Sequence, residues 1–184
     1  KNKITLRHLL THTSGFGYSG GTVKVEGFNN ENWNYEDAPR HFESGTNFLY
    51  GTSTDWAGKL VEKLTGMNLE EYFRENITEP LGMSRTFFNV PDSLHSLIVS
   101  HGNRGTDGQQ KLTESPNRIP NSKVTTFSGG AGLFSTPSDY TKLLQCLLNE
   151  GKYAEGTILK KETIFEMTAN QIGDITLNPE GKHF

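Results

Sequence analysis

The chain has 184 residues and a formal net charge of −3, with a pI near 6.1. This length suits one domain with a modest core, and the charge gives no electrostatic reason to expect nucleic acid or an anionic membrane surface as a partner. No apolar run reaches the roughly 20 residues that a membrane-spanning helix needs. The single cysteine, Cys146, excludes an internal disulfide.

The first predicted helix begins after Thr5, which can cap it, and is ended by Gly15. Its inward-facing residues would be Leu6, Leu9 and Leu10. A glycine- and asparagine-rich loop follows over residues 15–35. Its rings are Phe16, Tyr18, Phe28, Trp33 and Tyr35. These rings either fold over a substrate cleft or anchor the loop to the core, and the sequence leaves both readings open.

Capping residues and apolar spacing predict four more helices. Asn68 and Glu71 form a capping box, and Thr136 followed by Pro137 is a typical helix start. The expected bounds are 52–66, 68–82, 136–151 and 161–169. Residues 101–126 are expected to form a long loop, because they show little periodicity. The best strand signals lie at 22–25 and 175–177, so the chain is expected to be mainly α with long loops.

Several segments match the sequence motifs of one family, in the order in which that family has them. They are Ile-Thr-Leu-Arg-His-Leu-Leu-Thr-His-Thr-Ser-Gly at 4–15, Phe-Leu-Tyr-Gly-Thr at 48–52, the helix pattern at 56–66, Glu-Pro-Leu-Gly-Met at 79–83 and the glycine-rich stretch at 128–140. Together they resemble the serine β-lactamase-related hydrolases. That family includes class C β-lactamases, D-Ala-D-Ala carboxypeptidases, and family VIII-type esterases and transesterases.

The resemblance implies the β-lactamase/transpeptidase-like α+β fold. In that fold a helical lobe meets an α/β lobe, and the active site lies in the cleft between them. Residues 1–151 would form the helical lobe, and residues 152–184 would be the connection that returns toward the α/β lobe. Little of the sheet lobe is expected in this chain, so the remaining α/β lobe of a parent chain is its expected protein partner.

The family's nucleophile is the serine of a Ser-x-x-Lys motif that precedes the opening segment, and Lys-Thr-Gly or His-x-Gly follows much later. None of the serines from Ser14 to Ser138 has a lysine three positions on, and neither later motif occurs. The chain also begins with Lys1 rather than methionine. We therefore expect an internal piece of a longer hydrolase, which would be inactive alone.

By resemblance, Tyr50 aligns with the family tyrosine that transfers protons beside the serine and lysine. A phenol, with an ordinary pKa of about 10, is a poor base at neutral pH unless an ammonium group favours its ionised form. The alternative is that Tyr50 is only an aromatic residue before a helix cap. Thr52 stands where the family often has a substrate-binding asparagine. A threonine cannot supply the donor and acceptor of an amide, which favours esterase or acyltransferase members over β-lactamases.

Four further residues are expected to bind substrate by resemblance. Gly15 and Phe16 would reach the rim of the cleft, and Gly130 and Ala131 would approach the site from the opposite side. Small residues there would let a substrate pass close to the backbone. The alternative for each is that turn geometry alone explains it.

Three other motif matches lack the context that their chemistry requires. The Gly-x-Ser-x-Gly match at 17–21 has no strand before it and no helix after it, and the Gly-x-Gly-x-x-Gly match at 15–20 has no βαβ unit around it. His8 and His12 have the spacing of a zinc ligand pair, but no glutamate follows His8. We expect His12 to hydrogen-bond to backbone near the loop, and no metal or organic cofactor is implied.

The sequence therefore predicts part of a serine hydrolase that acts on a small-molecule ester, amide or β-lactam through an acyl-enzyme. One alternative is a β-lactamase-like protein that has lost catalysis and serves in binding or assembly. Another is an independent helical module that binds a partner in a groove lined by its loop aromatics.

Overall fold

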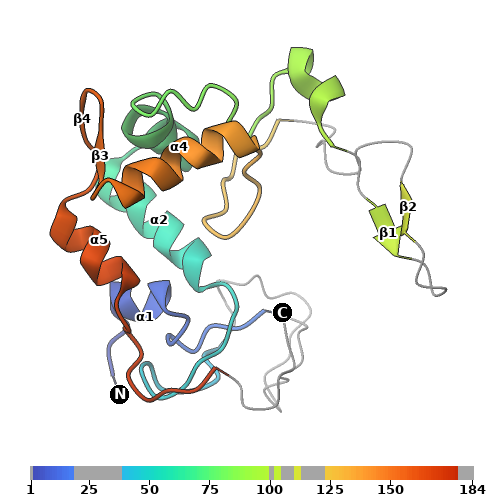
Figure 1. Ribbon diagram of the computed structural model, residues 1–184. Helices are drawn as coiled ribbons and strands as arrows, with labels where there is room; N and C mark the ends of the chain where they lie inside the picture. Colours follow the sequence, from blue (N-terminus) through green and yellow to red (C-terminus); the bar gives the residue numbers. More distant parts are fainter. Residues whose placement is uncertain (1, 19–38, 100–101, 105–109, 113–122, 178–184) are drawn as a thin grey trace.

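The computed structural model describes residues 2–18, 39–99, 102–104, 110–112 and 123–177. This part of the chain is mainly helical, as predicted (Figure 1). The helices are α1 (Leu6–Leu10), α2 (Ser53–Thr65), α3 (Leu69–Phe73), α4 (Pro137–Leu148) and α5 (Lys161–Thr168). A π-helical turn, η1 (Arg74–Thr78), continues α3, and a 3₁₀ helix, η2 (Asp92–Leu97), follows later. None of the helices in these ranges is long and apolar enough to cross a membrane.

The described residues also contain two antiparallel strand pairs and an isolated bridge between Phe87 and Phe134. β1 (Gly102–Arg104) pairs with β2 (Gln110–Leu112), and β3 (Lys152–Tyr153) pairs with β4 (Gly156–Thr157). The first pair lies inside the segment 101–126, so the expectation of loop throughout that segment is wrong. Residues 175–177 form no strand. The predicted strand at 22–25 lies outside the described residues.

The helix ends follow their sequence signals closely. The Asn68 Oδ1 accepts the Glu71 N–H at 2.9 Å, and the Glu71 carboxylate accepts the Asn68 N–H at 3.3 Å, which confirms the capping box. The Thr136 hydroxyl accepts the Asp139 N–H at 3.2 Å. α2 ends at Gly66, whose φ of 73° is left-handed.

The first helix is shorter than predicted. It ends at Leu10 rather than near Gly15, because His12 already has a left-handed φ of 54°. Only Leu9 of its three leucines is buried, at 7% exposure, whereas Leu6 is 51% and Leu10 is 60% exposed. The prediction that all three face inward is therefore wrong for two of them.

The apolar core within the described residues lies mainly between α3, α4 and the segment around residue 88. Its fully or nearly buried apolar side chains are Leu9, Leu69, Met83, Phe88 and Cys146. Phe88 stacks on Phe73 with ring centroids 5.8 Å apart and contacts Phe127 at 5.1 Å. α2 runs from beside α1 toward this core (Figure 1). Its N-terminal end therefore lies away from the core, and the candidate site is found there.

Candidate active site

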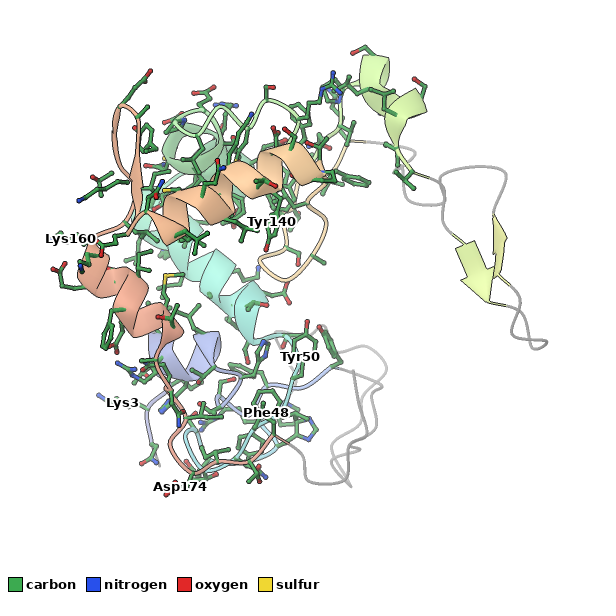
Figure 2. The ribbon with its side chains drawn as sticks, viewed as in Figure 1. Lys3, Phe48, Tyr50, Tyr140, Lys160 and Asp174 are labelled. Carbon is green, nitrogen blue, oxygen red and sulfur yellow. The ribbon has the colours of Figure 1, made fainter. Side chains whose placement is uncertain are left out.

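Tyr50 lies three residues before α2 begins and is 49% exposed. Figure 2 shows it near Phe48 at the start of that helix. Its ring lies against the His12 imidazole, with centroids 4.5 Å apart and planes 39° apart. The Tyr18 ring meets Tyr50 edge-on at 6.0 Å. We call His12, Tyr18 and Tyr50 the aromatic cluster.

The backbone on both sides of Tyr50 is tied to the segment that follows α1. The Leu49 N–H donates to the His12 carbonyl at 2.9 Å, and the Gly51 N–H donates to the His12 Nδ1 at 3.4 Å. A Cβ on Gly51 would lie 2.5 Å from the Phe16 carbonyl oxygen. Only glycine allows the two segments to approach this closely. The expected hydrogen bond between His12 and backbone near the loop is thus confirmed, with Gly51, which lies against residues 16 and 17, as the partner.

Buried serines fix the same two segments to α2. The Ser14 and Ser53 hydroxyls share a hydrogen bond of 2.8 Å, and both residues are completely buried. Ser44, also completely buried, donates to the Ser14 carbonyl at 3.0 Å and accepts from the Arg40 guanidinium at 2.8 Å. A buried hydroxyl left unpaired would cost free energy, so these bonds fix the position of α2's first residue.

A glycine-rich loop, residues 128–132, attaches to the first turn of α2 from another direction. The Ser128 hydroxyl donates to the Asp55 carboxylate, and the Gly130 N–H donates to the same oxygen at 3.2 Å. A Cβ on Gly129 would lie 2.2 Å from the Thr54 carbonyl oxygen. The structure therefore gathers residues 16–18, residue 50 and residues 128–132 around the N-terminal end of α2.

The predicted binding residues differ in how they are presented. Gly130 and Ala131 are exposed, and Phe16 is half-buried with its ring stacked on Trp56 at 5.3 Å. Thr52 is 4% exposed, and its hydroxyl donates to the Gly17 carbonyl at 3.4 Å.

Gly15 is buried as well and has a left-handed φ of 90°, with a position for a Cβ only 2.6 Å from the Phe42 carbonyl oxygen. Tyr50, Phe16, Gly130 and Ala131 thus have surface at this site. Thr52 and Gly15 instead contribute to its scaffold.

Two groups of the aromatic cluster have shifted pKa values. Burial raises the pKa of Tyr18, and the neighbouring Tyr50, through its charge when ionised and through a hydrogen bond, raises it further, as does the Asp55 carboxylate. Burial lowers the pKa of His12. At neutral pH the cluster therefore holds an uncharged imidazole and a Tyr18 that keeps its proton.

Sequence reasoning did not identify Asp55, Ser14 or Ser53 as parts of the site. Asp55 and Ser128 are 73 positions apart, and Ser14 and Ser53 are 39 positions apart. No local pattern marks such pairs. The available signal for these residues was that Ser14 and Ser128 occur within two of the segments that match the family motifs.

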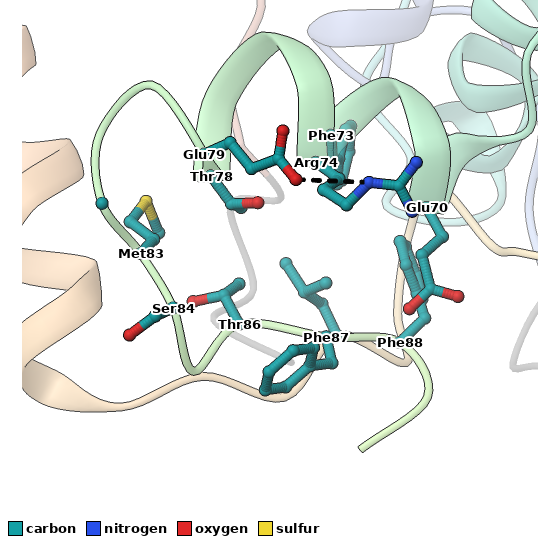
Figure 3. Close-up of a pocket in the computed structure, with 12 residues that line it drawn as sticks. Glu70, Phe73, Arg74, Thr78, Glu79, Met83, Ser84, Thr86, Phe87 and Phe88 are labelled. Atoms are coloured by element: carbon teal, nitrogen blue, oxygen red, sulfur yellow. Dashed lines mark ion pairs between the residues drawn. The ribbon is translucent and has the colours of Figure 1, made fainter. Parts of the chain in front are cut away.

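A separate pocket of about 530 Å³ lies between η1 and the segment 82–88 (Figure 3). Phe73, Phe87 and Phe88 are among its lining side chains, with Arg74 and Glu79 paired at 3.6 Å. Glu70 accepts both the backbone and side-chain N–H groups of Asn89. None of the aromatic cluster lines this pocket. Within the described ranges, no group of three or more His, Cys, Asp or Glu residues could hold a metal ion.

Comparison with known proteins identifies the class of protein to which this fold and site belong. The beta-lactamase family model matches residues 1–181, so the chain belongs to the beta-lactamase family. The fold is likewise β-lactamase-like: a mutant of simvastatin synthase from Aspergillus terreus superimposes with a TM-score of 0.74 at 34% identity. That comparison covers 90% of this chain and 40% of the other.

Two curated relatives are similar over most of this chain. Monacolin J acid methylbutanoyltransferase of Aspergillus terreus is 34% identical over 89% of this chain and 41% of its own length. Lovastatin esterase of Penicillium rubens is 29% identical over 92% of this chain and 45% of its own length. The chain thus spans less than half the length of these relatives.

Proposed function

We propose that the intact protein is a serine hydrolase of the esterase or acyltransferase type, in which this chain supplies the tyrosine that transfers protons. The single observation that carries the proposal is the setting of Tyr50. Its side chain is half exposed, while the backbone on either side of it is fixed by His12 and by a glycine approach that admits no larger residue. Similarity to an acyltransferase and to an esterase supports the same class.

The chemistry would be acyl transfer through a covalent intermediate. A serine outside this chain would attack the ester or amide carbonyl, and its proton would pass to a basic group while the leaving group is protonated. Tyr50 is the candidate for one or both of these transfers. Tyr18, which keeps its proton, can donate a hydrogen bond to the Tyr50 oxygen.

Substrate would bind along the surface that Phe16, Tyr50, Gly130 and Ala131 present. These residues are at least partly exposed and surround the start of α2. The inward placement of Thr52 leaves no exposed amide or hydroxyl at that position. This supports an ester substrate over a β-lactam or peptide whose acylamino group needs a polar partner there.

The partner of this chain would be the α/β lobe of a parent polypeptide, with residues 1–151 as helical lobe and 152–184 as the return. Arg7 of α1 and Glu166 of α5 form an ion pair of 2.7 Å, so the segment after residue 152 comes back to the beginning of the chain. Leu10 and Phe165, on the same two helices, are 60% and 74% exposed. Apolar surface of this kind favours a second lobe that covers it.

The test is the kinetics of the full-length polypeptide that contains these residues, with p-nitrophenyl acetate as substrate. Y50F should lower kcat/KM by about 100-fold or more, because a positioned general acid or base contributes about 10²- to 10⁴-fold. Y140F is the matched control, since Tyr140 is 54% exposed on α4 and lies outside the aromatic cluster. A Y50F protein as active as Y140F would overturn the proposal.

The isolated 184-residue chain should not hydrolyse the same ester with saturation kinetics. Saturable hydrolysis that a serine-directed reagent abolishes would show that the chain contains its own nucleophile. If the full-length protein is also inactive, the non-catalytic alternative, a binding or assembly protein of this fold, would replace the hydrolase proposal.

A further inference from the structure

His12 touches the residue on each side of Tyr50 as well as Tyr50 itself. Its carbonyl accepts the Leu49 N–H at 2.9 Å, its Nδ1 accepts the Gly51 N–H at 3.4 Å, and its ring lies 4.5 Å from the Tyr50 ring. The carbonyl and the imidazole of His12 thus both contact the segment that carries Tyr50. A residue that only filled space would not need all three contacts.

The backbone of His12 adds a second observation. Its φ of 54° is left-handed, a conformation that histidine, like asparagine and aspartate, adopts more often than most residues other than glycine. That conformation turns the chain after α1, so that the carbonyl and the imidazole of His12 both reach the segment 49–51. The same turn ends α1, because the Thr13 N–H donates to the His8 carbonyl at 3.0 Å and the His12 N–H donates to the Leu9 carbonyl at 3.3 Å.

Only the neutral imidazole can make the bond to Gly51. Nδ1 accepts a hydrogen bond there, so the proton of the uncharged ring is on Nε2. When the ring is protonated, both nitrogens become donors, and Nδ1–H would point at the Gly51 N–H. The bond that holds residue 51 would then be replaced by a repulsive contact.

We propose that His12 is a positioning residue for Tyr50. The neutral imidazole of His12 holds Tyr50 in place, and protonation of that imidazole releases it. This inference rests on the proposed function of Tyr50. The inference adds that acid pH would disturb the site by breaking the contact between His12 and Gly51. This effect is separate from any effect of pH on the nucleophile.

The surroundings of His12 support this assignment. Among the described residues, the titratable side chain whose ring contacts His12 is Tyr50, from the segment before α2, whereas the His8 Nδ1 accepts the Thr5 N–H at 3.3 Å. Tyr18 contacts Tyr50, and Asp55 of α2 acts on Tyr18. Among the described residues, no carboxylate lies within ion-pair distance of His12, so nothing there offsets the cost of its burial when charged.

The first arm of the test uses full-length protein labelled with ¹⁵N-glycine and ring-labelled tyrosine. In a pH titration followed by NMR, the Gly51 amide and the Tyr50 ring should shift together, at a midpoint below the ordinary histidine value of about 6.5. This arm needs no variant, so it does not depend on whether a substitution folds. Resonances of Gly51 and Tyr50 that do not follow the titration of His12 would overturn the inference.

The second arm measures ester hydrolysis by H12F and H12N. H12F keeps an aromatic ring beside Tyr50 but loses the acceptor, and H12N tolerates the left-handed backbone but loses the ring. Each should lower kcat by about 10- to 100-fold with little change in KM, because a small misplacement of a catalytic group has effects of that size. The pH profiles of both variants should also lack the fall in kcat at acid pH that protonation of His12 causes in the wild type.

The control for this arm is H95N. The His95 ring binds the Val90 carbonyl at 2.9 Å in η2, away from the aromatic cluster, so its loss should leave kcat unchanged. Wild-type kcat in H12F and H12N, while Y50F is inactive, would overturn the positioning role and leave the proposed function intact. An inactive wild-type protein in which Gly51 and Tyr50 still follow His12 would reject the proposed function and support the contact.

Discussion

Asp139 fastens α4 to the segment that precedes the pocket, and replacing it should destabilise the chain. The residue is 3% exposed, and its carboxylate accepts the Arg85 N–H at 2.7 Å and the Thr86 hydroxyl at 3.1 Å. Lys142 pairs with the other carboxylate oxygen at 3.1 Å. Asp139 belongs to one of the family segments, and its contacts show a structural reason for an aspartate at this position.

The size of the effect follows from what each partner would do after D139A. The Arg85 N–H would lose its acceptor in a half-buried position. The Thr86 hydroxyl could still pair with Ser135, at 2.8 Å, and Lys142 could still donate to the Gly82 carbonyl. One unpaired donor and one weakened pair should therefore cost about 2 to 4 kcal/mol of unfolding free energy.

The pH dependence has a definite sign. Burial acts to raise the pKa of Asp139, but hydrogen bonds from Arg85, Lys142 and Thr86 outweigh it and leave the pKa lowered. A carboxyl whose pKa is lower in the folded state stabilises the fold above its unfolded pKa of about 3.9, and that contribution is lost as the pH falls through the folded value. The difference in unfolding free energy between wild type and D139N should therefore become smaller below about pH 4.

The assay is urea unfolding of the chain, followed by tryptophan fluorescence, at neutral and at acid pH. D92A is the matched control, because the Asp92 side chain is 98% exposed and the same substitution there should change stability by less than about 0.5 kcal/mol. A cost of D139A no larger than that of D92A would refute the reasoning. So would a difference between wild type and D139N that stays constant as the pH falls.

Three further substitutions test the scaffold and the exposed surface. G129A should cost about 1 to 3 kcal/mol in urea unfolding, because its Cβ would lie 2.2 Å from a backbone oxygen of α2. G156A, whose Cβ would meet only a tyrosine side chain at 3.1 Å, is its control, and equal losses would contradict the account. N68A should cost about 1 kcal/mol by removing the α3 cap, and an unchanged thermal midpoint would contradict this. Phe165 is 74% exposed, so F165Q should reduce both the binding of a hydrophobic dye and the aggregation of the 184-residue chain. The unfolding free energy should change by less than about 0.5 kcal/mol. Increased aggregation would argue against an uncovered apolar face.

Local signals predicted the starts of α3 and α4, but not where the first helix ends or which neighbours cover the helix faces. Asn68 with Glu71, and Thr136 with Pro137, act within one turn, and the structure has both as expected. Apolar spacing reports that a helix has an apolar face, but not which neighbour covers that face. Leu148, for example, is the last residue of α4 and is 84% exposed although it is apolar.

The candidate site divides in the same way. The family wording identified Tyr50 and the loop at residue 130, and the structure brings both to the start of α2. Matching the family motifs could not tell exposed site residues from buried ones. Thr52 and Gly15 were therefore expected at the surface of the site, but both are buried. The contact of His12 with Tyr50 depends on a left-handed φ, which no pattern of residue types specifies.

The scaffold around Tyr50 depends on hydrogen bonds rather than on apolar packing. Several apolar faces of the described helices are exposed. The start of α2, by contrast, is held by bonds between fully buried small residues, Ser14, Ser44 and Ser53. Such bonds are directional, and leaving any one partner unpaired is costly, so they specify one geometry. We therefore expect the backbone at Tyr50 to keep its conformation when the apolar faces of α1 and α5 gain or lose a covering lobe. The role that we propose for Tyr50, where two lobes would meet, requires this property, because the orientation of its side chain must not depend on how tightly the lobes close.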